Sequence, residues 1–403
     1  MRMQTLDAIL NADPEFFTRH TVGRVVGIVV TQTTTAGQAI LAVIKQLSIT
    51  LLMLLYVAIL LALSVPLTLI ILAFAGLVSA AVKANIVRIG DFGLESAHVN
   101  QEMMGKIVER FNLVRLIKLR DQKAAESRLI AGFTETMRAI AVKQARLGAN
   151  IEVTADPLLM LSVFITLYIG ISVLGMSLAQ LGLLLFVLNR LNAKVKEFNA
   201  GRQAISQNMA GLLLVREMTE DAERSNTIRR GPLPFAGLER EIVFDDVSFD
   251  YPESLGPDGT VTSSGKEVLK GVSVSVPAGS LTALVGRSGG GKSTLVELIP
   301  RLRDVSGGHI TLDGVDIAEY DVGALRKGIG YLTQTAMLFD DTVRVNLTYG
   351  LDFEPTEEQI RSALEGAYAT FVYDLPHGLE TRLGDQGVRF SGGERQRIAL
   401  ARV

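Results

Sequence analysis

A glycine-rich turn at residues 286–294 carries the clearest chemistry in the sequence. Its letters, GRSGGGKST, lie between two apolar stretches, residues 281–285 and residues 295–299. They fit the pattern G-x-x-x-x-G-K-[ST], in which backbone N–H groups close around phosphates. A strand leading into the turn and a helix leading out of it would add the positive end of a helix dipole. The spacing therefore predicts a nucleoside triphosphate site, with ATP as the expected ligand; the alternative is a turn without a ligand.

Within this turn the side chains have different expected roles. Lys292 would reach the outer phosphates, and the Ser293 hydroxyl would suit Mg²⁺. The other positions expected to contact the nucleotide are Gly286, Arg287, Ser288, Gly289, Gly290, Gly291 and Thr294.

Three further positions carry weaker signals. Tyr251, which ends the predicted strand 241–251, is a candidate for stacking on adenine, although the residues alone favour a core or edge aromatic. Gln334 follows a predicted strand, residues 329–333, and could bind Mg²⁺ or orient a water molecule. The letters SGGE at residues 391–394 begin a predicted helix whose N-terminus would offer a second phosphate-sized anion site; a simple helix cap is the alternative.

Composition indicates separate apolar and polar parts. Hydrophobic residues make up 48% of the 403 positions, yet charged residues still make up 20%. A net charge of −2 gives no reason to expect nucleic-acid binding. The chain has no cysteine, which excludes disulfides and thiolate metal sites. The first residues contain acids and a proline, so they do not form a signal peptide.

Two long stretches without charged side chains predict membrane spans. Residues 46–82 and 157–189 each lack Asp, Glu, Lys and Arg. As single helices they would be roughly 55 Å and 50 Å long, against a hydrocarbon core of about 30 Å. Each stretch therefore suits two spans, with turns near Pro66 and Gly175, which gives four spans at about 41–63, 66–88, 153–174 and 177–199. Two buried hairpins of a soluble helical bundle are the alternative.

Basic residues predict the orientation of these spans. The two short turns have none, whereas the segment between the hairpins contains Arg88, Lys106, Arg110, Arg115, Lys118, Arg120, Lys123, Arg128, Arg138 and Lys143. The segment is therefore expected in the cytosol, as two long helices with a bend at residues 116–122 that could contact a nucleotide-binding domain. The hydroxyls of Ser162, Thr166, Tyr168 and Ser172 could line a substrate path, or they could hydrogen-bond between helices or back to their own backbone.

The second half of the chain predicts an α/β domain. A helix at residues 194–223 would lead to a linker rich in glycine and proline at residues 228–238. We expect a surface loop at residues 253–266, a strand VLKGVSVSV before the phosphate turn, and a hairpin about Asp313 and Gly314, which makes Asp313 and Asp316 structural. A further helical segment is expected at residues 356–373. The expected domains are residues 1–230 (transmembrane), 231–240 (linker) and 241–403 (nucleotide-binding).

The ordered motifs Tyr251, GRSGGGKST, Gln334, GDQG and FSGGERQR resemble those of the ATP-binding cassette (ABC) transporters, specifically exporters with fused membrane and nucleotide-binding domains. The resemblance implies that Tyr251 stacks on adenine, that Ser293 and Gln334 share Mg²⁺, and that Lys292 and Gln334 act in catalysis. It also implies that Asp385 lies in a loop that communicates with the membrane domain. Ser391, Gly392, Gly393 and Glu394 would face the γ-phosphate of ATP held by a partner.

The implied partners are a second half-transporter, in a homodimer or heterodimer, the lipid bilayer and a transported substrate, with no nucleic acid. The implied location is the bacterial inner membrane, with the nucleotide-binding domain in the cytosol. The cargo is not named by these motifs; apolar spans with scattered hydroxyls favour a hydrophobic or amphipathic molecule.

The sequence also departs from the family pattern. Phe390 and Glu394 are variants of the usual signature L-S-G-G-Q, and the family's magnesium-binding Asp, catalytic Glu and switch His would lie beyond Val403. Family members have six membrane spans in each half-transporter, whereas this sequence predicts four. These departures predict an α-helical transmembrane domain followed by an incomplete α/β P-loop domain, which binds ATP without turning it over. A non-transporting gate or regulator, an inactive truncated ATP-binding membrane protein, and a soluble P-loop enzyme on a membrane anchor are the alternatives.

Overall fold

The structure, a computed structural model, describes residues 1–251, 254–255, 261–263, 266–384 and 387–403. Asp385 and much of the expected loop at residues 253–266 lie outside the described residues. The described residues divide into two compact units, one of Met1–Thr227 with Leu255, the other of Ile228–Ser254 and Val261–Val403. We call them the helical unit and the α/β unit, and describe each by itself.

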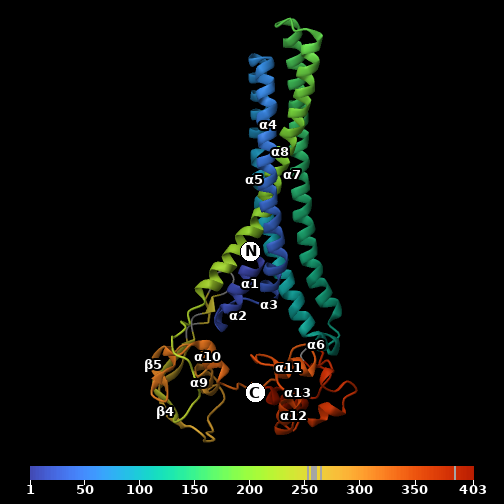
Figure 1. Cartoon of the computed structure of the whole chain (residues 1–403). Helices are drawn as coiled ribbons and strands as arrows, with labels where there is room; N and C mark the ends of the chain where they lie inside the picture. The colour runs from blue at the N-terminus through green and yellow to red at the C-terminus, as the bar shows by residue number, and fades with distance from the viewer. Residues whose placement is uncertain (252–253, 256–260, 264–265, 385–386) are drawn as a thin grey trace. The chain divides into compact units, whose positions relative to one another are not determined.

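The helical unit is entirely α-helical apart from one π-helical turn (Figure 1). Its elements, in chain order, are α1 (Arg2–Asn11), α2 (Pro14–Arg19), α3 (Val22–Gly27), the π-helical η1 (Ile28–Gln32), α4 (Thr33–Leu63), α5 (Val65–Asn112), α6 (Val114–Leu119), α7 (Lys123–Ser172) and α8 (Leu178–Arg224).

Four candidate spans are present, as expected. The helices Val22–Leu63, Val65–Asn112, Lys123–Ser172 and Leu178–Arg224 are each long and apolar enough to cross a membrane. The first expected turn is shorter than predicted, because α4 ends at Leu63 and α5 begins at Val65, with Pro66 in its first turn. Proline suits that position because the first N–H groups of a helix have no intrahelical partner. The second turn contains Gly175 at φ +59°, a left-handed conformation that favours glycine.

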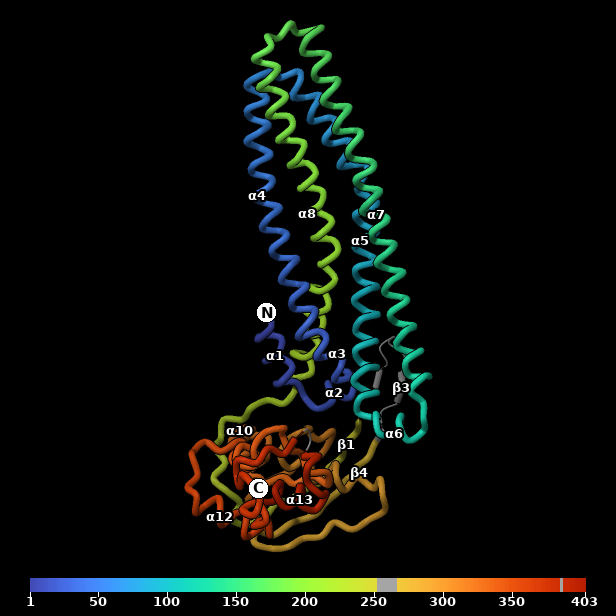
Figure 2. The backbone as a smooth tube through the Cα atoms, turned by 90° about the vertical axis from the view of Figure 1, so that its right-hand side faces the viewer, coloured from blue at the N-terminus to red at the C-terminus, as the bar shows by residue number. Residues whose placement is uncertain are grey.

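The four long helices pack along apolar seams. In Figure 2, α5 runs beside α7 and α4 beside α8, which agrees with their contacts. Leu60, Leu67, Leu184 and Leu188 form the centre of one seam, and each is fully buried. Other faces stay open, since only 11% of the most apolar window of the first span is buried inside the protein. Such a surface is stable only against lipid or other apolar helices.

Two of the hydroxyls in the third span bond within their own helix. The Ser162 hydroxyl donates to the Leu159 carbonyl at 2.6 Å, and the Thr166 hydroxyl donates to the Ser162 carbonyl at 2.7 Å. Both side chains are buried. Of the alternatives left open by the sequence, hydrogen bonding to the helix's own backbone is therefore the one observed at these two positions.

Beyond the spans, the helices continue as predicted. The expected bend at residues 116–122 contains the short helix α6, and an ion pair of 2.8 Å between Arg110 and Glu126 joins the helices on either side. The helix expected at residues 194–223 is the continuation of α8, which runs without a break to Arg224.

The α/β unit mixes a sheet with short helices. Its elements are β1 (Glu241–Tyr251), β2 (Ser254–Leu255), β3 (Val261–Ser263), β4 (Lys266–Pro277), α9 (Lys292–Leu298), β5 (Gly307–Leu312), β6 (Val315–Asp316), the 3-10 helix η2 (Ile317–Glu319), α10 (Val322–Lys327), α11 (Val343–Thr348), α12 (Glu357–Gly366), the 3-10 helices η3 (Thr370–Asp374) and η4 (Gly378–Glu380), and α13 (Gly392–Arg402).

The main sheet is antiparallel, with the strand order β4-β1-β5-β6. The hairpin predicted about Asp313 and Gly314 is confirmed, and both residues have positive φ. The Asp313 carboxylate accepts N–H bonds of 2.7 to 3.0 Å from residues 239–241, at the start of β1. Those bonds hold the pKa of Asp313 below its ordinary value; the largest contribution is the Glu239 N–H. Asp313 is therefore structural.

Two predicted strands and one predicted helix are wrong in whole or in part. Residues 281–285 and residues 329–333 form no strand, and Leu281 is fully exposed. A strand needs a neighbour for its backbone N–H and C=O groups, and within the described residues neither stretch has one. The helix expected at residues 356–373 is divided into α12 and η3, and the expected loop at residues 253–266 includes two short strands.

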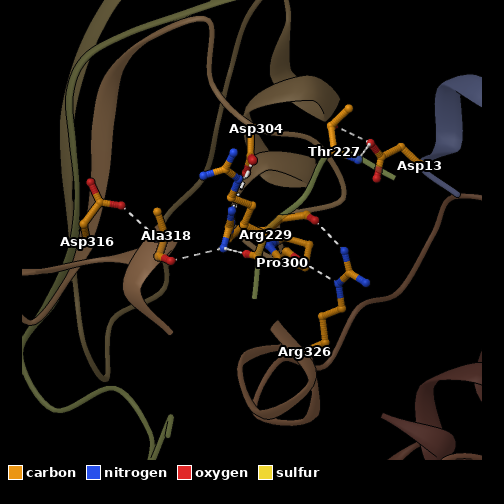
Figure 3. Close-up of polar contacts among 9 residues, drawn as sticks. Asp13, Thr227, Arg229, Pro300, Asp304, Asp316, Ala318 and Arg326 are labelled. Atoms are coloured by element: carbon orange, nitrogen blue, oxygen red, sulfur yellow. Dashed lines mark hydrogen bonds and ion pairs between the residues drawn. The ribbon is translucent and has the colours of Figure 1, made fainter. Parts of the chain in front are cut away.

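A buried arginine, Arg301, follows α9 and bonds to other parts of the α/β unit; Figure 3 labels its partners Asp304, Arg229 and Ala318. Arg301 is 3% exposed, and its guanidinium bonds to both oxygens of Asp304 at 2.9 and 3.1 Å. The same guanidinium donates to the carbonyls of Arg229 and Ala318. A buried charge is stable only when it is paired in this way. The contact with Arg229 also attaches the linker segment to the α/β unit.

Candidate nucleotide-binding site

The glycine-rich turn, residues 286–294, adopts a conformation that requires glycine at two positions. Gly289 and Gly291 have φ of +77° and +81°. At Gly291, which caps the N-terminus of α9, an added Cβ would lie 2.7 Å from Leu269 Cδ2 and 3.3 Å from the Val268 carbonyl oxygen. The glycines therefore allow the chain to turn sharply from residues 281–285 into α9, as the motif predicts.

The lysine of the turn folds back across it. Lys292 Nζ donates to the carbonyls of Gly286 and Arg287 at 2.9 and 2.8 Å. The ammonium group therefore lies over the loop that the motif assigns to phosphate, and the Ser293 side chain beside it is exposed. Gly286, Arg287, Ser288 and Gly290 are exposed as well, so the loop is accessible from solvent.

The structure brings Tyr251 to the same turn. The Tyr251 hydroxyl lies 3.1 Å from Thr294 Oγ1, and Thr294 is 5% exposed. These residues are 43 positions apart in the sequence, and the pairing of β1 with β4 joins them. A half-buried aromatic ring therefore lies beside the glycine-rich turn, at the position where the sequence predicts adenine stacking.

The second predicted anion site is a capped helix. Ser391 is the N-cap of α13, its hydroxyl accepts from the Glu394 N–H at 3.3 Å, and its own N–H donates to Glu394 Oε2 at 2.7 Å. The Ser391 bonds hold the pKa of Glu394 below its usual value. Glu394 therefore stabilises the cap, a role that the sequence left as the alternative. Gly392 and Gly393 remain exposed, with open space where a Cβ would stand.

Gln334 is exposed and lies beside the same helix. The Gln396 side chain of α13 donates to the Gln334 carbonyl at 3.1 Å, and Arg402 donates to the Met337 carbonyl at 2.8 Å. Sequence reasoning missed Gln396, although it stands within the FSGGERQR motif. These bonds link the Gln334 segment to α13 within the α/β unit.

The predicted magnesium ligands have the right chemistry. Ser293 offers a hydroxyl oxygen and Gln334 an amide oxygen, and both are exposed. Mg²⁺ prefers hard oxygen ligands and is commonly held by few protein groups together with phosphates and water. The described residues contain no cluster of three or more His, Cys, Asp or Glu side chains that could hold a metal ion.

Two family models match the chain. The ABC transporter transmembrane region matches residues 1–192, and the ABC transporter model matches residues 269–403. The ATP-dependent lipid A-core flippase of Cupriavidus metallidurans is 32% identical over 423 aligned positions, which cover 100% of this chain and 67% of the flippase. The chain belongs to the ABC transporter family.

Other relatives of this ABC transporter chain match in part. The lipid A-core flippase of Desulfotalea psychrophila is 41% identical over 201 residues, or 50% of this chain and 32% of the flippase. The heterocyst differentiation ATP-binding protein of Nostoc is 30% identical over 79% of this chain and 50% of its own length. The chain thus spans 32% to 67% of the length of these three relatives.

The fold has a solved counterpart. A bacterial Atm1-family ABC exporter with ATP bound matches 99% of this chain and 69% of its own, with a TM-score of 0.86 and 23% identity. The fold class is therefore that of an ABC exporter, a helical transmembrane region followed by an ATP-binding domain in one polypeptide. The predicted family and fold class are confirmed, and the chain is a membrane protein that uses ATP.

Proposed function

We propose that this chain is one half of an exporter that uses MgATP to move an amphipathic, lipid-like molecule across a bacterial inner membrane. The observation that carries the proposal is the glycine-rich turn, where two left-handed glycines and the folded-back Lys292 form an exposed loop next to Tyr251. In this proposal ATP lies on the loop with its adenine on Tyr251, and Ser293 and Gln334 bind Mg²⁺. The bound magnesium ion would neutralise charge on the phosphates.

The nucleotide part of the proposal is tested by binding. The purified protein in lipid nanodiscs is titrated with MgATP in a calorimeter, beside the Lys292→Ala variant and the control variant Lys270→Ala. Lys270 is an exposed cation on β4 that pairs with Glu267. We expect Lys292→Ala to weaken ATP binding by tenfold or more, since a charged phosphate contact is worth about 1.5–3 kcal/mol. Equal affinities for all three proteins would refute the site.

We further propose a partner. The exposed glycines at the start of α13 would contact the γ-phosphate of ATP held by a second half-transporter, in a homodimer or a heterodimer. ATP would then join the two ATP-binding domains, and hydrolysis would let them separate. The cytosolic position of these domains and the inner-membrane location belong to the same proposal.

A groove in the helical unit supports an amphipathic cargo. It has a volume of about 510 Å³ and lies between α5 and α8. Ile86, Leu94 and Met209 contribute apolar surface, and Asp91 and Arg202 contribute one charge of each sign. Among the described residues neither charged side chain has an ion-pair partner. Two unpaired charges beside apolar side chains suit a molecule with a charged head and apolar chains.

The cargo proposal has a direct optical test, because the chain contains no tryptophan. A Met209→Trp variant places a single tryptophan in the groove. A lipid brominated in its acyl chains quenches tryptophan on contact, so we expect stronger quenching at residue 209 than in a Val142→Trp control. Val142 lies on the exposed surface of α7, outside the groove. Transport of a labelled lipid A analogue into vesicles then separates an exporter from a non-transporting gate.

A further inference from the structure

Tyr251 is held on several sides. Its hydroxyl meets Thr294 Oγ1 at 3.1 Å, and its ring meets the Phe249 ring edge-on, with centroids 5.1 Å apart and planes at 86°. These two contacts fix the position of the hydroxyl and the tilt of the ring. A third contact covers one face, because the Arg303 guanidinium carbon lies 4.8 Å from the ring centroid, over the ring.

Arg303 is itself held in place. Its side chain is 11% exposed, and its Nε donates to Glu297 Oε2 at 3.4 Å. Glu297 belongs to α9, the helix that follows the glycine-rich turn. A planar guanidinium stacks on aromatic faces while it pairs with a carboxylate at its edge, which an ammonium group cannot do. Arg303 therefore connects the face of Tyr251 to the helix that would receive the phosphates.

We propose that Arg303 is a positioning residue for the nucleotide base. It covers one face of Tyr251, leaves the opposite face for a purine, and holds the ring at the angle at which the base stacks. This inference rests on the proposed function, in which Tyr251 receives adenine. Arg303 does not touch the nucleotide; it acts through the tyrosine ring.

This role separates base recognition from phosphate binding. The phosphates meet the glycine-rich turn and Lys292, and neither depends on the Tyr251 ring face. Loss of the guanidinium should therefore weaken binding of a nucleoside triphosphate and leave binding of tripolyphosphate, which has no base, unchanged. A residue that only stabilised the fold around α9 would weaken both ligands equally.

The test measures MgATP and magnesium tripolyphosphate affinities by calorimetry for the protein in nanodiscs. Arg303→Gln removes the charge and keeps most of the length, Arg303→Lys keeps the charge without the planar group, and Lys270→Gln is the matched control on β4. We expect Arg303→Gln to weaken ATP binding about three- to tenfold. We expect Arg303→Lys to weaken ATP binding less than Arg303→Gln does. The tripolyphosphate affinity of both variants should change by less than twofold, and the control should keep both affinities.

A second comparison uses Tyr251→Leu. If Arg303 acts through the ring, Arg303→Gln should have no additional effect in the Tyr251→Leu background, because the shared partner is already gone. Equal losses for ATP and tripolyphosphate, additive losses in the double variant, or unchanged ATP affinity would each overturn the inference while the nucleotide site stands. Failure of the unaltered protein to bind either ligand would overturn the proposed site and the inference together. Should Arg303→Gln not fold, the same comparisons are made with Arg303→Lys.

Discussion

At the scale of residues, the glycines of the glycine-rich turn differ in the side chains that they tolerate. Gly289 and Gly291 share a left-handed backbone, yet an added Cβ meets open space at Gly289 and crowded atoms at Gly291. Position 291 therefore combines two penalties, the unfavourable φ of an L-residue and contact with β4. It is the more sensitive of the two.

We expect Gly291→Ala to destabilise the α/β unit by about 1–3 kcal/mol and to weaken ATP binding, because the turn must distort. The measurement is the thermal unfolding midpoint together with ATP affinity. Gly132→Ala in α7 is the control, since no heavy atom lies within 4 Å of its added Cβ and alanine favours the helix by about 1 kcal/mol. Similar midpoints for the two variants would contradict the prediction.

Asp313 predicts a pH dependence of stability. Its pKa is lowered from the ordinary 3.8, chiefly by the Glu239 N–H. A lowered carboxyl pKa in the folded state stabilises the fold above the ordinary value, and that contribution is lost as the pH falls through the folded-state pKa.

The variant Asp313→Asn should therefore be less stable than the unaltered protein at neutral pH. Asparagine tolerates the positive φ at this position, so the variant isolates the charge. The difference in urea midpoint should shrink as the pH falls below the ordinary aspartate value of 3.8. A difference that stays constant as the pH is lowered well below 3.8 would show that the charge is not involved.

At the scale of elements, predictions succeeded where the pattern was local. The charge-free runs at residues 46–82 and 157–189 identified the spans, and the turn residues identified the hairpin about Asp313. The strands expected at residues 281–285 and 329–333 did not form, because strand formation depends on partners elsewhere in the chain.

In the candidate site too, local patterns were predicted from the sequence and contacts between distant residues were not. The motif at residues 286–294 was recognised from spacing alone, since its glycines act through their own backbone. Three side-chain contacts could be found only from the folded structure, because each joins residues that are far apart in the sequence. They are the contacts of Tyr251 with Thr294, of Gln396 with Gln334, and of Arg303 with Tyr251. Arg303 in particular belongs to no motif.

Polar contacts join residues 13–20, which we call the N-terminal corner, to the end of α8. Asp221 near the end of α8 lies 3.3 Å from Arg19 and 2.6 Å from His20. Asp13 accepts from the N–H of Thr227 at 2.9 Å, as Figure 3 shows. These three contacts indicate that the N-terminal corner and the end of α8 stabilise each other's position.

Asp221→Asn should destabilise the helical unit by about 1–2 kcal/mol, because it removes the charge that Arg19 and His20 share. Glu217→Gln, on the same stretch of α8, is the control, since the described residues offer Glu217 no ion-pair partner. Thermal unfolding in nanodiscs is the measurement. An equal shift for both variants would assign the effect to net charge instead of to this contact.

At the scale of the whole molecule, the proposed pairing of two halves depends on α13. Ser391→Arg would place a long cation at its exposed N-terminus, where a partner's phosphates are proposed to bind. We expect this variant to lose ATP-induced pairing, measured by light scattering with and without MgATP, while it keeps ATP affinity at its own glycine-rich turn.

The matched control is Thr356→Arg. Thr356 caps α12 with the same reciprocal bonds that Ser391 makes with Glu394, here with Gln359. Each variant therefore loses a helix cap worth about 0.5–2 kcal/mol. Loss of pairing in both would indicate general destabilisation, and retention in both would exclude α13 from the contact.

The unbroken course of α8 has a mechanical consequence. The helix has 47 residues and therefore measures about 70 Å from Leu178 to Arg224. Along a rod of that length, a tilt of about 5° displaces one end by about 6 Å relative to the other. Small rotations at the Arg224 end would thus become displacements as wide as an acyl chain at the Leu178 end, so α8 can serve as a lever.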